Sequence, residues 1–423
     1  MRRGFGKKAY RSTAIPLPTY SLNFTTGTLS PDITFTRSSS ATYFDSTGTL
    51  KTATTNTPRF DYNPSTLAAL GLLIEEARTN SLRNNSMAGA AAGTPGTAPT
   101  YWVMPGSING LTQQIVGTGT ENGITYIDIR YSGTTNTSGS HGISFEAANQ
   151  IAAASGQTWT RSAWFKIAAG STANLNALNH NTQGRNAANT AFTETFATDI
   201  APSLTGTLKR FSTASTLADP NTAFARSQIQ YFYNSGVAID LTLRIGLPQF
   251  EQGAFVTSVI ATTSAAATRS ADVATISGAN FTKWFQSGPG TVYAVYTYGS
   301  GIGSNAQAMY SFSDGGETNR LIAFKTTLLS QQFDETGGGG SIVIAGAAAN
   351  TTYKSAFAYD NNNMAVSVNG GTVGTDTSVT ISNKAQLNIG DRATGGRSLN
   401  GWISAINYYP YRLPDINLQT LTS

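Results

Sequence analysis

A strict alternation of apolar and polar positions runs through Leu241-Thr242-Leu243-Arg244-Ile245-Gly246-Leu247. Successive side chains of a strand point to opposite faces of its sheet, so the four leucine and isoleucine side chains are expected to share one face. Thr242 and Arg244 then lie on the other face. The pattern predicts an antiparallel strand that is buried on one face only.

The same period of two recurs along the chain, with turn residues between the runs and no long helical period. The other strand-like runs are 124–131, 158–167, 229–233, 291–298, 364–368 and 402–409. Asn369-Gly370 directly follows the run that ends at Val368, and both residues tolerate the positive φ of a type I′ hairpin turn. The chain is therefore predicted to be all-β and built from two-layer sandwiches.

Composition supports folded domains with a polar surface. Charged residues make up 12% of the chain, about half of the usual share, whereas hydrophobic residues reach 39%. This apolar content is enough to bury a core, and 423 residues suggest two or three folding units. Cysteine is absent, so folding cannot depend on disulfides and no thiolate can hold a metal.

Four regions are predicted from the turn-rich and proline-rich joints. They are a basic arm with a proline spacer over 1–20, a small β anchor region over 21–87, a jelly-roll sandwich over 88–270 and a second sandwich over 271–423. Residues 88–99 are small residues with Gly and Pro, which is typical of a surface loop or an interdomain joint.

The net charge comes from the N-terminal arm. Five cations are the only charged residues before Asp32, namely Arg2, Arg3, Lys7, Lys8 and Arg11. Removing them from the 27 Lys and Arg leaves 27 − 5 = 22 cations against 22 acids. The body is therefore not expected to bind nucleic acid specifically. The arm is predicted to dock on an acidic partner or a phosphate surface, with a solvated tail as the alternative.

The ends of the sequence also bear on where the protein is assembled. The N-terminus lacks the apolar segment of a secretory signal, and the most apolar stretch, Leu67 to Ile74, is too short to cross a bilayer. We therefore expect assembly in a cytoplasm without membrane insertion, unless cell lysis or a holdase-type export route releases the protein.

Three N-terminal stretches resemble a signature of bacteriophage fibre and spike proteins, including the head-spike fibres of gene transfer agents. They are Phe35-Thr36-Arg37-Ser38-Ser39-Ser40-Ala41-Thr42-Tyr43-Phe44-Asp45, Pro58-Arg59-Phe60-Asp61-Tyr62 and Gly71-Leu72-Leu73-Ile74-Glu75-Glu76-Ala77-Arg78-Thr79-Asn80. The end of the middle unit is similar to the end of the carbohydrate-binding-module-like jelly roll of those proteins. Its residues are Pro248-Gln249-Phe250-Glu251-Gln252-Gly253-Ala254-Phe255-Val256-Thr257-Ser258 and Thr268-Arg269-Ser270-Ala271-Asp272-Val273.

The last unit is similar to a concanavalin-A-like or laminin-G-like sandwich. The residues that carry this likeness are Val368-Asn369-Gly370-Gly371, Leu387-Asn388-Ile389-Gly390 and Leu399-Asn400-Gly401-Trp402. Together the resemblance implies a head or tail fibre of a virion, commonly a homotrimer, that binds other virion proteins through its N-terminal region and contacts bacterial surface polysaccharide with its outer domains. It implies no enzyme and no cofactor, and it supplies no binding site, because such sandwiches host many functions.

Candidate sugar-binding residues come from the aromatic content, because a pyranose needs an aromatic face flanked by directional hydrogen-bonding groups. The tryptophans are Trp102, Trp159, Trp164, Trp284 and Trp402. Alternation in 158–167 places Trp164 on the polar face of its strand, which makes it a candidate, but a core position is favoured over a ligand contact because one bulge would reverse the assignment. Tyr101 and Trp102, beside the Gly/Pro-rich loop, are expected to be exposed, with an interdomain contact as the alternative.

Other polar groups favour structural roles. Glu75 and Glu76 would point to opposite faces of a strand, so they are expected to pair with Arg78 or another chain and not to act as an acid and base pair. His141 and His180 are expected on surface loops, without a metal site or catalytic triad. Asp360-Asn361-Asn362-Asn363 is favoured as a turn over a calcium loop, and Gly337 to Gly340 as a hairpin tip.

Four functions remain open at this point. An adhesive fibre is favoured, because weak sugar contacts repeated on several subunits gain avidity. A structural adaptor or decoration protein would bind only other virion proteins. A polysaccharide depolymerase is disfavoured by the lack of a β-helix repeat and of convergent acids. A free secreted lectin is disfavoured by the missing signal peptide.

Overall fold

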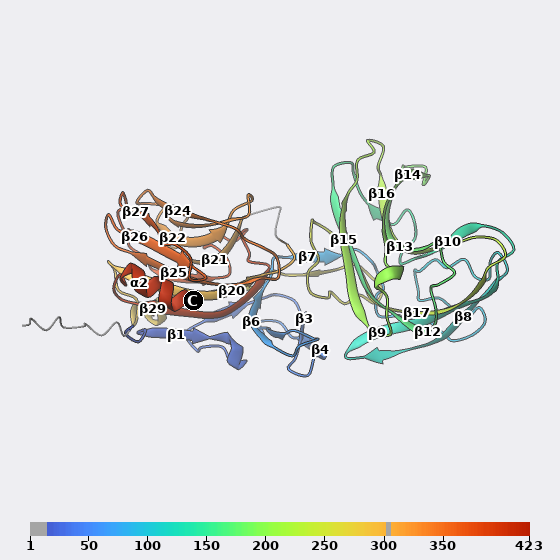
Figure 1. The fold of residues 1–423 in the computed structure, drawn as a ribbon, viewed down its shortest axis with the longest axis horizontal. Coiled ribbons are helices and arrows are strands. Elements are labelled where there is room, and N and C mark those ends of the chain that lie inside the picture. The colour runs from blue at the N-terminus through green and yellow to red at the C-terminus, as the bar shows by residue number, and fades with distance from the viewer. Residues whose placement is uncertain (1–14, 302–305) are drawn as a thin grey trace, which may run out of the picture.

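A computed structural model describes residues 15–301 and 306–423, and these form two β lobes (Figure 1). The blue N-terminal strands and the orange to red C-terminal strands share one lobe, and the cyan to yellow strands between them form the other. The five basic residues of the predicted docking arm, Arg2, Arg3, Lys7, Lys8 and Arg11, lie outside the described residues.

The first lobe, here called the terminal sandwich, pairs two large sheets. Among the described residues, one sheet has eight strands, which are β1 (Tyr20–Asn23), β5 (Phe60–Tyr62), β6 (Ala69–Ile74), β20 (Gly290–Tyr298), β25 (Thr352–Tyr359), β26 (Met364–Val368), β27 (Gly374–Asp376) and β29 (Gly401–Tyr409). The other has seven, which are β2 (Thr34–Thr36), β19 (Val273–Ser277), β21 (Gln307–Ser313), β22 (Arg320–Lys325), β23 (Ser330–Glu335), β24 (Gly340–Ala345) and β28 (Gln386–Ile389). Short helices complete the lobe, which are η1 (Phe24–Thr26), α1 (Ala279–Thr282) and α2 (Asp415–Thr422).

The second lobe, here called the inserted sandwich, spans residues 81–266. One of its sheets contains β10 (Gly139–Ser144), β11 (Ile151–Ala152), β13 (Ala177–Arg185), β14 (Ala191–Asp199) and β16 (Phe224–Tyr233). The facing sheet contains β8 (Leu111–Glu121), β9 (Ile124–Thr134), β12 (Thr158–Gly170), β15 (Lys209–Thr216) and β17 (Ala238–Gln252), and η2 (Ala201–Ser203) lies between strands.

A two-stranded neck joins the lobes. The chain leaves the terminal sandwich along β7 (Arg78–Asn80) and returns along β18 (Ala267–Arg269), and these two strands pair antiparallel, with Arg78 opposite Arg269. A separate hairpin of β3 (Ala41–Phe44) and β4 (Leu50–Ala53), here called the joint hairpin, lies beside the neck.

The prediction of an all-β chain with two sandwiches is confirmed. The region over 21–87 differs from the small separate β region that the sequence predicts, because its strands are members of the terminal sandwich. β6 pairs with β29, and β2 pairs with β19. The physical reason is the core: Leu22, Phe24 and Phe35 are buried in the same hydrophobic cluster as residues beyond 270. Burying these side chains requires the C-terminal sheets.

The alternating run that starts at Leu241 is a strand, with one correction at its end. Leu241, Leu243 and Ile245 are fully buried between the two sheets of the inserted sandwich. A bulge interrupts the pairing with β12 after Gly246, and Leu247 has a φ of 40°. The extra residue turns Leu247 to the opposite face, where it packs against Trp164. The prediction that Leu247 shares the face of Leu241 is therefore wrong.

Both histidines also differ from the expectation of surface loops. His141 lies in β10 and His180 in β13, and each is at least 96% buried, with exposures of 4% and 1%. His141 stacks on Tyr231 with ring centroids 4.7 Å apart, and burial lowers its pKa to about 4. Both imidazoles are core side chains of the inserted sandwich.

Candidate functional site

Trp102 and Tyr101, the sequence-predicted sugar contacts near the loop, occupy different environments. Trp102 is only 6% exposed, its indole N–H donates to the carbonyl of Asn84 at 2.9 Å, and its ring meets Phe145 edge-on. The expectation that it is exposed is wrong, because its side chain belongs to the hydrophobic core cluster of the inserted sandwich. Tyr101 is half-buried, with the guanidinium of Arg83 at 3.9 Å from its ring centroid.

Trp164 does lie on the outer face of its strand, as the alternation predicts, but that face is covered. The ring is 5% exposed and packs with Ile124, Leu247 and Val259, against which Phe44 and Leu50 of the joint hairpin also pack. Trp164 therefore fills the contact between the two lobes. It also borders a cavity, described below.

The remaining tryptophans divide into core and cavity positions. Trp159 is stacked on Phe250, and Trp284 is stacked on Tyr20 with ring centroids 4.3 Å apart. Both are buried. Trp402 is half-buried and lines the same cavity as Trp164.

Five buried charged residues, Arg37, Arg59, Glu75, Arg269 and Asp272, form what is here called the ionic cluster at the base of the neck. Arg59 and Arg269 each donate to Glu75 Oε2 at 2.7 Å, and Arg37 donates to Asp272 Oδ1 at 3.0 Å. Arg59 also pairs with Asp272. Each of these side chains is at most 7% exposed. Removing one partner would leave an uncompensated buried charge, so the cluster locks the geometry of the joint.

The electrostatics of Glu75 follow from this arrangement. Burial alone would raise the pKa of Glu75, but the guanidinium groups of Arg269 and Arg59 and hydrogen bonds from Ser258 hold it at about 2. Ser258 donates from its backbone N–H at 2.8 Å and from its hydroxyl at 2.6 Å. Glu75 is therefore ionised, and both of its carboxylate oxygens accept hydrogen bonds within the cluster.

Glu76 makes a second connection across the neck. Arg78 donates to Glu76 Oε1 at 2.6 Å, as the sequence predicts, and Asn400 donates to Glu76 Oε2 at 3.0 Å. Arg78 also donates to the carbonyl of Gln252 at 2.8 Å. One short segment thus links the neck to both sandwiches.

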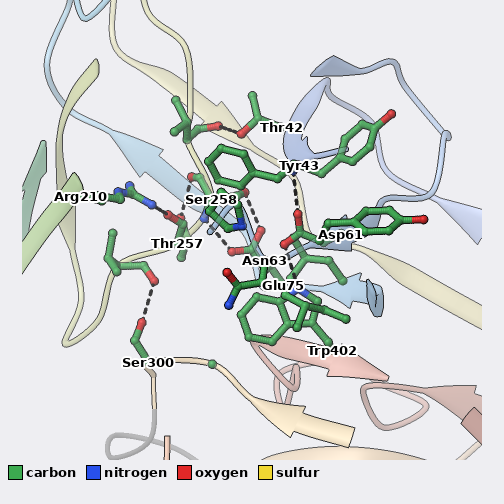
Figure 2. A pocket seen from close by; sticks show the side chains of 18 of the residues that line it. Thr42, Tyr43, Asp61, Asn63, Glu75, Arg210, Thr257, Ser258, Ser300 and Trp402 are labelled. Atoms are coloured by element: carbon green, nitrogen blue, oxygen red, sulfur yellow. Dashed lines mark hydrogen bonds between the residues drawn. The ribbon is translucent and has the colours of Figure 1, made fainter. Parts of the chain in front are cut away.

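A cavity of about 250 Å³, here called the joint cavity, opens between the joint hairpin, the terminal sandwich and the inserted sandwich (Figure 2). Half-buried aromatic side chains from three elements line it, namely Tyr43, Phe44, Tyr62 and Trp402. Polar groups complete the wall, including Asp61, Asn63, Arg210, Ser258 and Ser300. The volume lies just below the range of about 300–1,000 Å³ that is usual for small-molecule pockets, so the joint cavity suits a short ligand.

Asp61 lies at the aromatic end of the joint cavity. Its Oδ1 accepts from the backbone N–H of Phe44 at 2.7 Å, and its Oδ2 accepts from the indole N–H of Trp402 at 2.8 Å. Burial raises the pKa of Asp61 to about 6, and the nearby charge of Glu75 adds to the rise, although these two hydrogen bonds and Arg59 oppose it. Asp61 orients Trp402 and ties β5 to the joint hairpin.

Arg210 lies on the other side of the joint cavity, on β15 of the inserted sandwich (Figure 2). Its Nη1 donates to the carbonyl of Thr257 at 2.7 Å and its Nη2 to the hydroxyl of Ser162 at 3.0 Å. Its guanidinium carbon is 4.6 Å from the Trp164 ring centroid. Burial lowers its pKa to about 10, so the group stays cationic at neutral pH.

The joint cavity was missed at the sequence level, although its residues stand in the stretches that carry the fibre resemblance. Tyr43 and Phe44 belong to the first of these stretches, and Asp61 and Tyr62 to the second. Their shared location in these stretches was the one feature of the sequence that could have indicated a site. No such feature distinguished Trp402 or Arg210, because their contact with the cavity depends on the pairing of strands far apart in sequence.

Three further observations concern metal ligands, membrane-spanning helices and the predicted turn at 360–363. Within 15–301 and 306–423, no group of three or more His, Cys, Asp or Glu residues could hold a metal ion. The described helices are all too short or too polar to span a bilayer. Asp360 to Asn363 forms a turn, with the Asp360 N–H bonded to the Asn363 carbonyl at 3.1 Å.

No protein-family model matches the chain, and no curated protein matches it. Several solved structures resemble part of it. The carbohydrate-binding module CBM40 of the Ruminococcus gnavus IT-sialidase, bound to α2,3-sialyllactose, is 16% identical with a TM-score of 0.29, over 32% of this chain and 83% of that one. The NanB sialidase of Streptococcus pneumoniae is 15% identical with a TM-score of 0.29, over 33% of this chain and 25% of that one.

A SAP-like pentraxin from Limulus polyphemus is 16% identical with a TM-score of 0.25, over 33% of this chain and 73% of that one. Each of the three likenesses covers about a third of the chain. At these scores they say nothing about the ligand or activity of this protein.

Proposed function

We propose that this protein is a non-enzymatic glycan-binding component of a virion fibre or spike, and that the joint cavity is its sugar site. The observation that carries the proposal is the lining of that cavity. Aromatic side chains of Tyr43, Tyr62 and Trp402 line one small space together with amide, hydroxyl and carboxyl groups. This combination suits a pyranose, whose apolar face stacks on aromatic rings while its hydroxyls take directed hydrogen bonds.

The virion role is supported by the resemblance of the signature stretches to phage fibre and spike proteins. In this chain those stretches supply the ionic cluster, through Arg37, Arg59 and Glu75, and one wall of the joint cavity. A rigid joint suits a projecting fibre. Repetition of a weak site on several subunits, for which we propose a homotrimer, would raise avidity without new contacts.

The sugar site is tested on an array of bacterial capsular polysaccharides and lipopolysaccharides. Trp402→Ala removes a stacking face and is expected to weaken retention about tenfold or more, which corresponds to ~1.4 kcal/mol. Tyr101→Ala, at the position that the sequence alone favoured, is the matched control and should leave retention unchanged. Loss of binding in Tyr101→Ala with normal binding in Trp402→Ala would move the site to the loop, and no retention of the native protein would refute glycan binding.

The virion role has its own test. Deleting residues 2–11 is expected to leave folded protein that fails to join particles, because the basic arm is the proposed attachment to other virion proteins. Particle incorporation is measured by gel analysis of purified particles. Normal incorporation of the truncated protein would refute the docking role of the arm.

A polysaccharide depolymerase is the second candidate, and one observation favours it. Asp61 lines the joint cavity with a pKa of about 6, which suits a general acid. The other cavity carboxylate, Glu75, is engaged by two arginines and Ser258, so the second acid that hydrolysis requires is not free. Sustained release of reducing sugar from host capsule, abolished in Asp61→Asn, would establish the enzyme in place of the lectin.

A further inference from the structure

We propose that the ligand of the joint cavity is an acidic glycan, and that its carboxylate is bound by the guanidinium group of Arg210. This inference rests on the proposed sugar site and names the class of sugar that would fill it. It is carried by the position of Arg210 at the cavity, where no carboxylate among the described residues forms a direct ion pair with it.

Arg210 is fixed in place by the inserted sandwich. It is paired in register with Trp164 of the neighbouring strand, and its guanidinium lies over the Trp164 ring. This cation–π contact helps to hold the guanidinium group in place. The two acceptors of Arg210, the Thr257 carbonyl and the Ser162 hydroxyl, are both uncharged.

Another buried arginine shows what a fully satisfied guanidinium looks like in this fold. Arg161 also has no carboxylate partner within the described part of the chain, but it makes four hydrogen bonds, to the His180 carbonyl and the hydroxyls of Thr182, Ser215 and Thr198. Arg210 makes two, and its buried Nε has no partner among the described residues. Donor capacity is therefore left over on the arginine that borders the cavity.

The acids nearest to Arg210 are committed to other groups. Glu251 accepts from the N–H and the hydroxyl of Thr257, and Glu75 is held by Arg59, Arg269 and Ser258. Across the described residues, no carboxylate oxygen lies within 4.0 Å of the Arg210 nitrogens. An arriving anion would not have to displace an existing ion pair.

The carboxylate of Glu75 in the cavity wall does not exclude an acidic ligand. Glu75 is paired with Arg59 and Arg269 of the ionic cluster, so its charge is compensated. Asp61 lies on the opposite side of the cavity from Arg210 (Figure 2).

These positions orient the ligand. The sugar ring would stack at the end formed by Tyr62 and Trp402, and its carboxylate would point toward Arg210. A carboxylate held by guanidinium N–H groups makes charge-assisted hydrogen bonds that are shorter and stronger than those to a hydroxyl. A neutral sugar of the same shape would lose these bonds and leave the Arg210 donors unpaired.

The test uses the full chain and pairs of polysaccharides. Capsular polysaccharides that contain hexuronic acid are immobilised beside the same polymers with their carboxylates chemically reduced to alcohols. The native protein is expected to bind the carboxylate forms about 10- to 100-fold more tightly, the range for hydrogen bonds to a charged group. Arg210→Gln should abolish this preference, and Arg210→Lys should retain part of it because it keeps the charge.

Lys209→Gln is the matched control, because Lys209 is the exposed neighbour on the same strand and its loss changes the net charge equally. It should leave the preference intact, and thermal unfolding verifies that each variant is folded. Equal binding of both polymer forms by native protein, or an unchanged preference in Arg210→Gln, would overturn the assignment while leaving the sugar site in place. Binding of neither form would refute the proposed function together with this inference.

Discussion

The two sandwiches are assembled from the chain in opposite ways. The inserted sandwich uses one continuous segment, 81–266, and its core cluster begins at Leu82 and ends at Phe250. The terminal sandwich uses both ends of the chain, and its core joins Leu22 and Phe24 to residues near 400. A sandwich made from one segment contains all of its own strands, whereas one made from two segments depends on the return of the chain through the neck. Two segments that are far apart in the sequence can therefore belong to the same lobe.

The largest effect is expected when the two lobes are produced as separate fragments and their folding is compared. A fragment of residues 81–266 should fold alone, because its two sheets and its core are complete within it. A fragment of residues 271–423 should remain unfolded, because it lacks β1, β2, β5 and β6 and exposes the core faces that they cover. Circular dichroism and cooperative thermal unfolding measure both outcomes.

Addition of a peptide of residues 15–80 to the second fragment provides the control, since it returns the missing strands. Recovery of cooperative unfolding in the mixture would support the two-segment assembly. A fragment of 271–423 that unfolds cooperatively by itself would contradict the two-segment assembly of the terminal sandwich, because the N-terminal strands would then be dispensable.

The next effect concerns the ionic cluster that joins the two regions. Glu75→Gln removes the charge that compensates Arg59 and Arg269 in a buried site, and is expected to cost about 3–5 kcal/mol of unfolding free energy. Urea denaturation followed by fluorescence measures the loss. Arg130→Gln is the control, because its pair with Asp240 is exposed on the inserted sandwich and should not contribute measurably.

The free energy of unfolding is expected to depend on pH in opposite ways through the two cavity carboxylates, Asp61 and Glu75. The pKa of Asp61 is raised from 3.8 to about 6, so the native state holds the proton more tightly than the unfolded chain, and ionisation costs stability as the pH rises from about 4 to about 6. At 1.36 kcal/mol for each pKa unit, the total is about 3 kcal/mol. The unfolding free energy of native protein minus that of Asp61→Asn should fall by this amount across the interval.

Ionisation of Glu75 has the opposite effect on the free energy of unfolding, because it stabilises the native state. Its pKa is lowered to about 2, so its stabilising effect is complete above about pH 4.5 and is lost as the pH falls toward 2. Titration of the carboxyl carbons by NMR measures both groups directly. An Asp61 signal that titrates near pH 4 would contradict the burial of this side chain against Trp402.

The smallest effect is expected from the loss of one hydrogen bond, which connects the joint hairpin to the segment that follows the last strand of the inserted sandwich. Thr42 donates from its hydroxyl to the Val259 carbonyl at 2.7 Å, in a buried setting. Thr42→Val should cost about 1–2 kcal/mol, because it leaves that carbonyl unpaired. Thr52→Val, at the cross-strand partner that faces solvent, should change stability by less than about 0.5 kcal/mol.

Much of the fold could be predicted because local pattern and burial agree in it. The run at 364–368 is β26 as predicted, and Asn369 and Gly370 have φ values of 47° and 68°, as a primed turn requires. The run at 402–409 lies within β29. Strand existence was readable because alternation reports burial on one face.

Partnership between strands could not be predicted in this way. Nothing in the period of β1 indicates that Tyr20 pairs with Tyr408, some 390 residues later. The bulge at Leu247 was equally hidden, since it depends on the register with β12. Pairing is set by which faces fit together in three dimensions, and a single sequence carries little of that information.

The candidate site was predicted less well than the fold, for a physical reason. Trp102 was expected to be exposed, and the structure buries it; Trp164 was a candidate for which a core position was favoured, and it is buried as well. A site made at a joint combines residues from three elements, so no local pattern reveals it. Only the co-occurrence of aromatic and acidic residues in the signature stretches pointed in that direction.

The neck has a consequence for how such a protein changes over time. Because Arg78 and Arg269 are cross-strand neighbours, the inserted sandwich enters and leaves its host at a single point. Exchange of everything between them for a different module, or for a tight turn, would leave every strand of the host sheets uncut. A lineage could therefore acquire a different inserted module by recombination at two nearby positions while retaining the terminal sandwich.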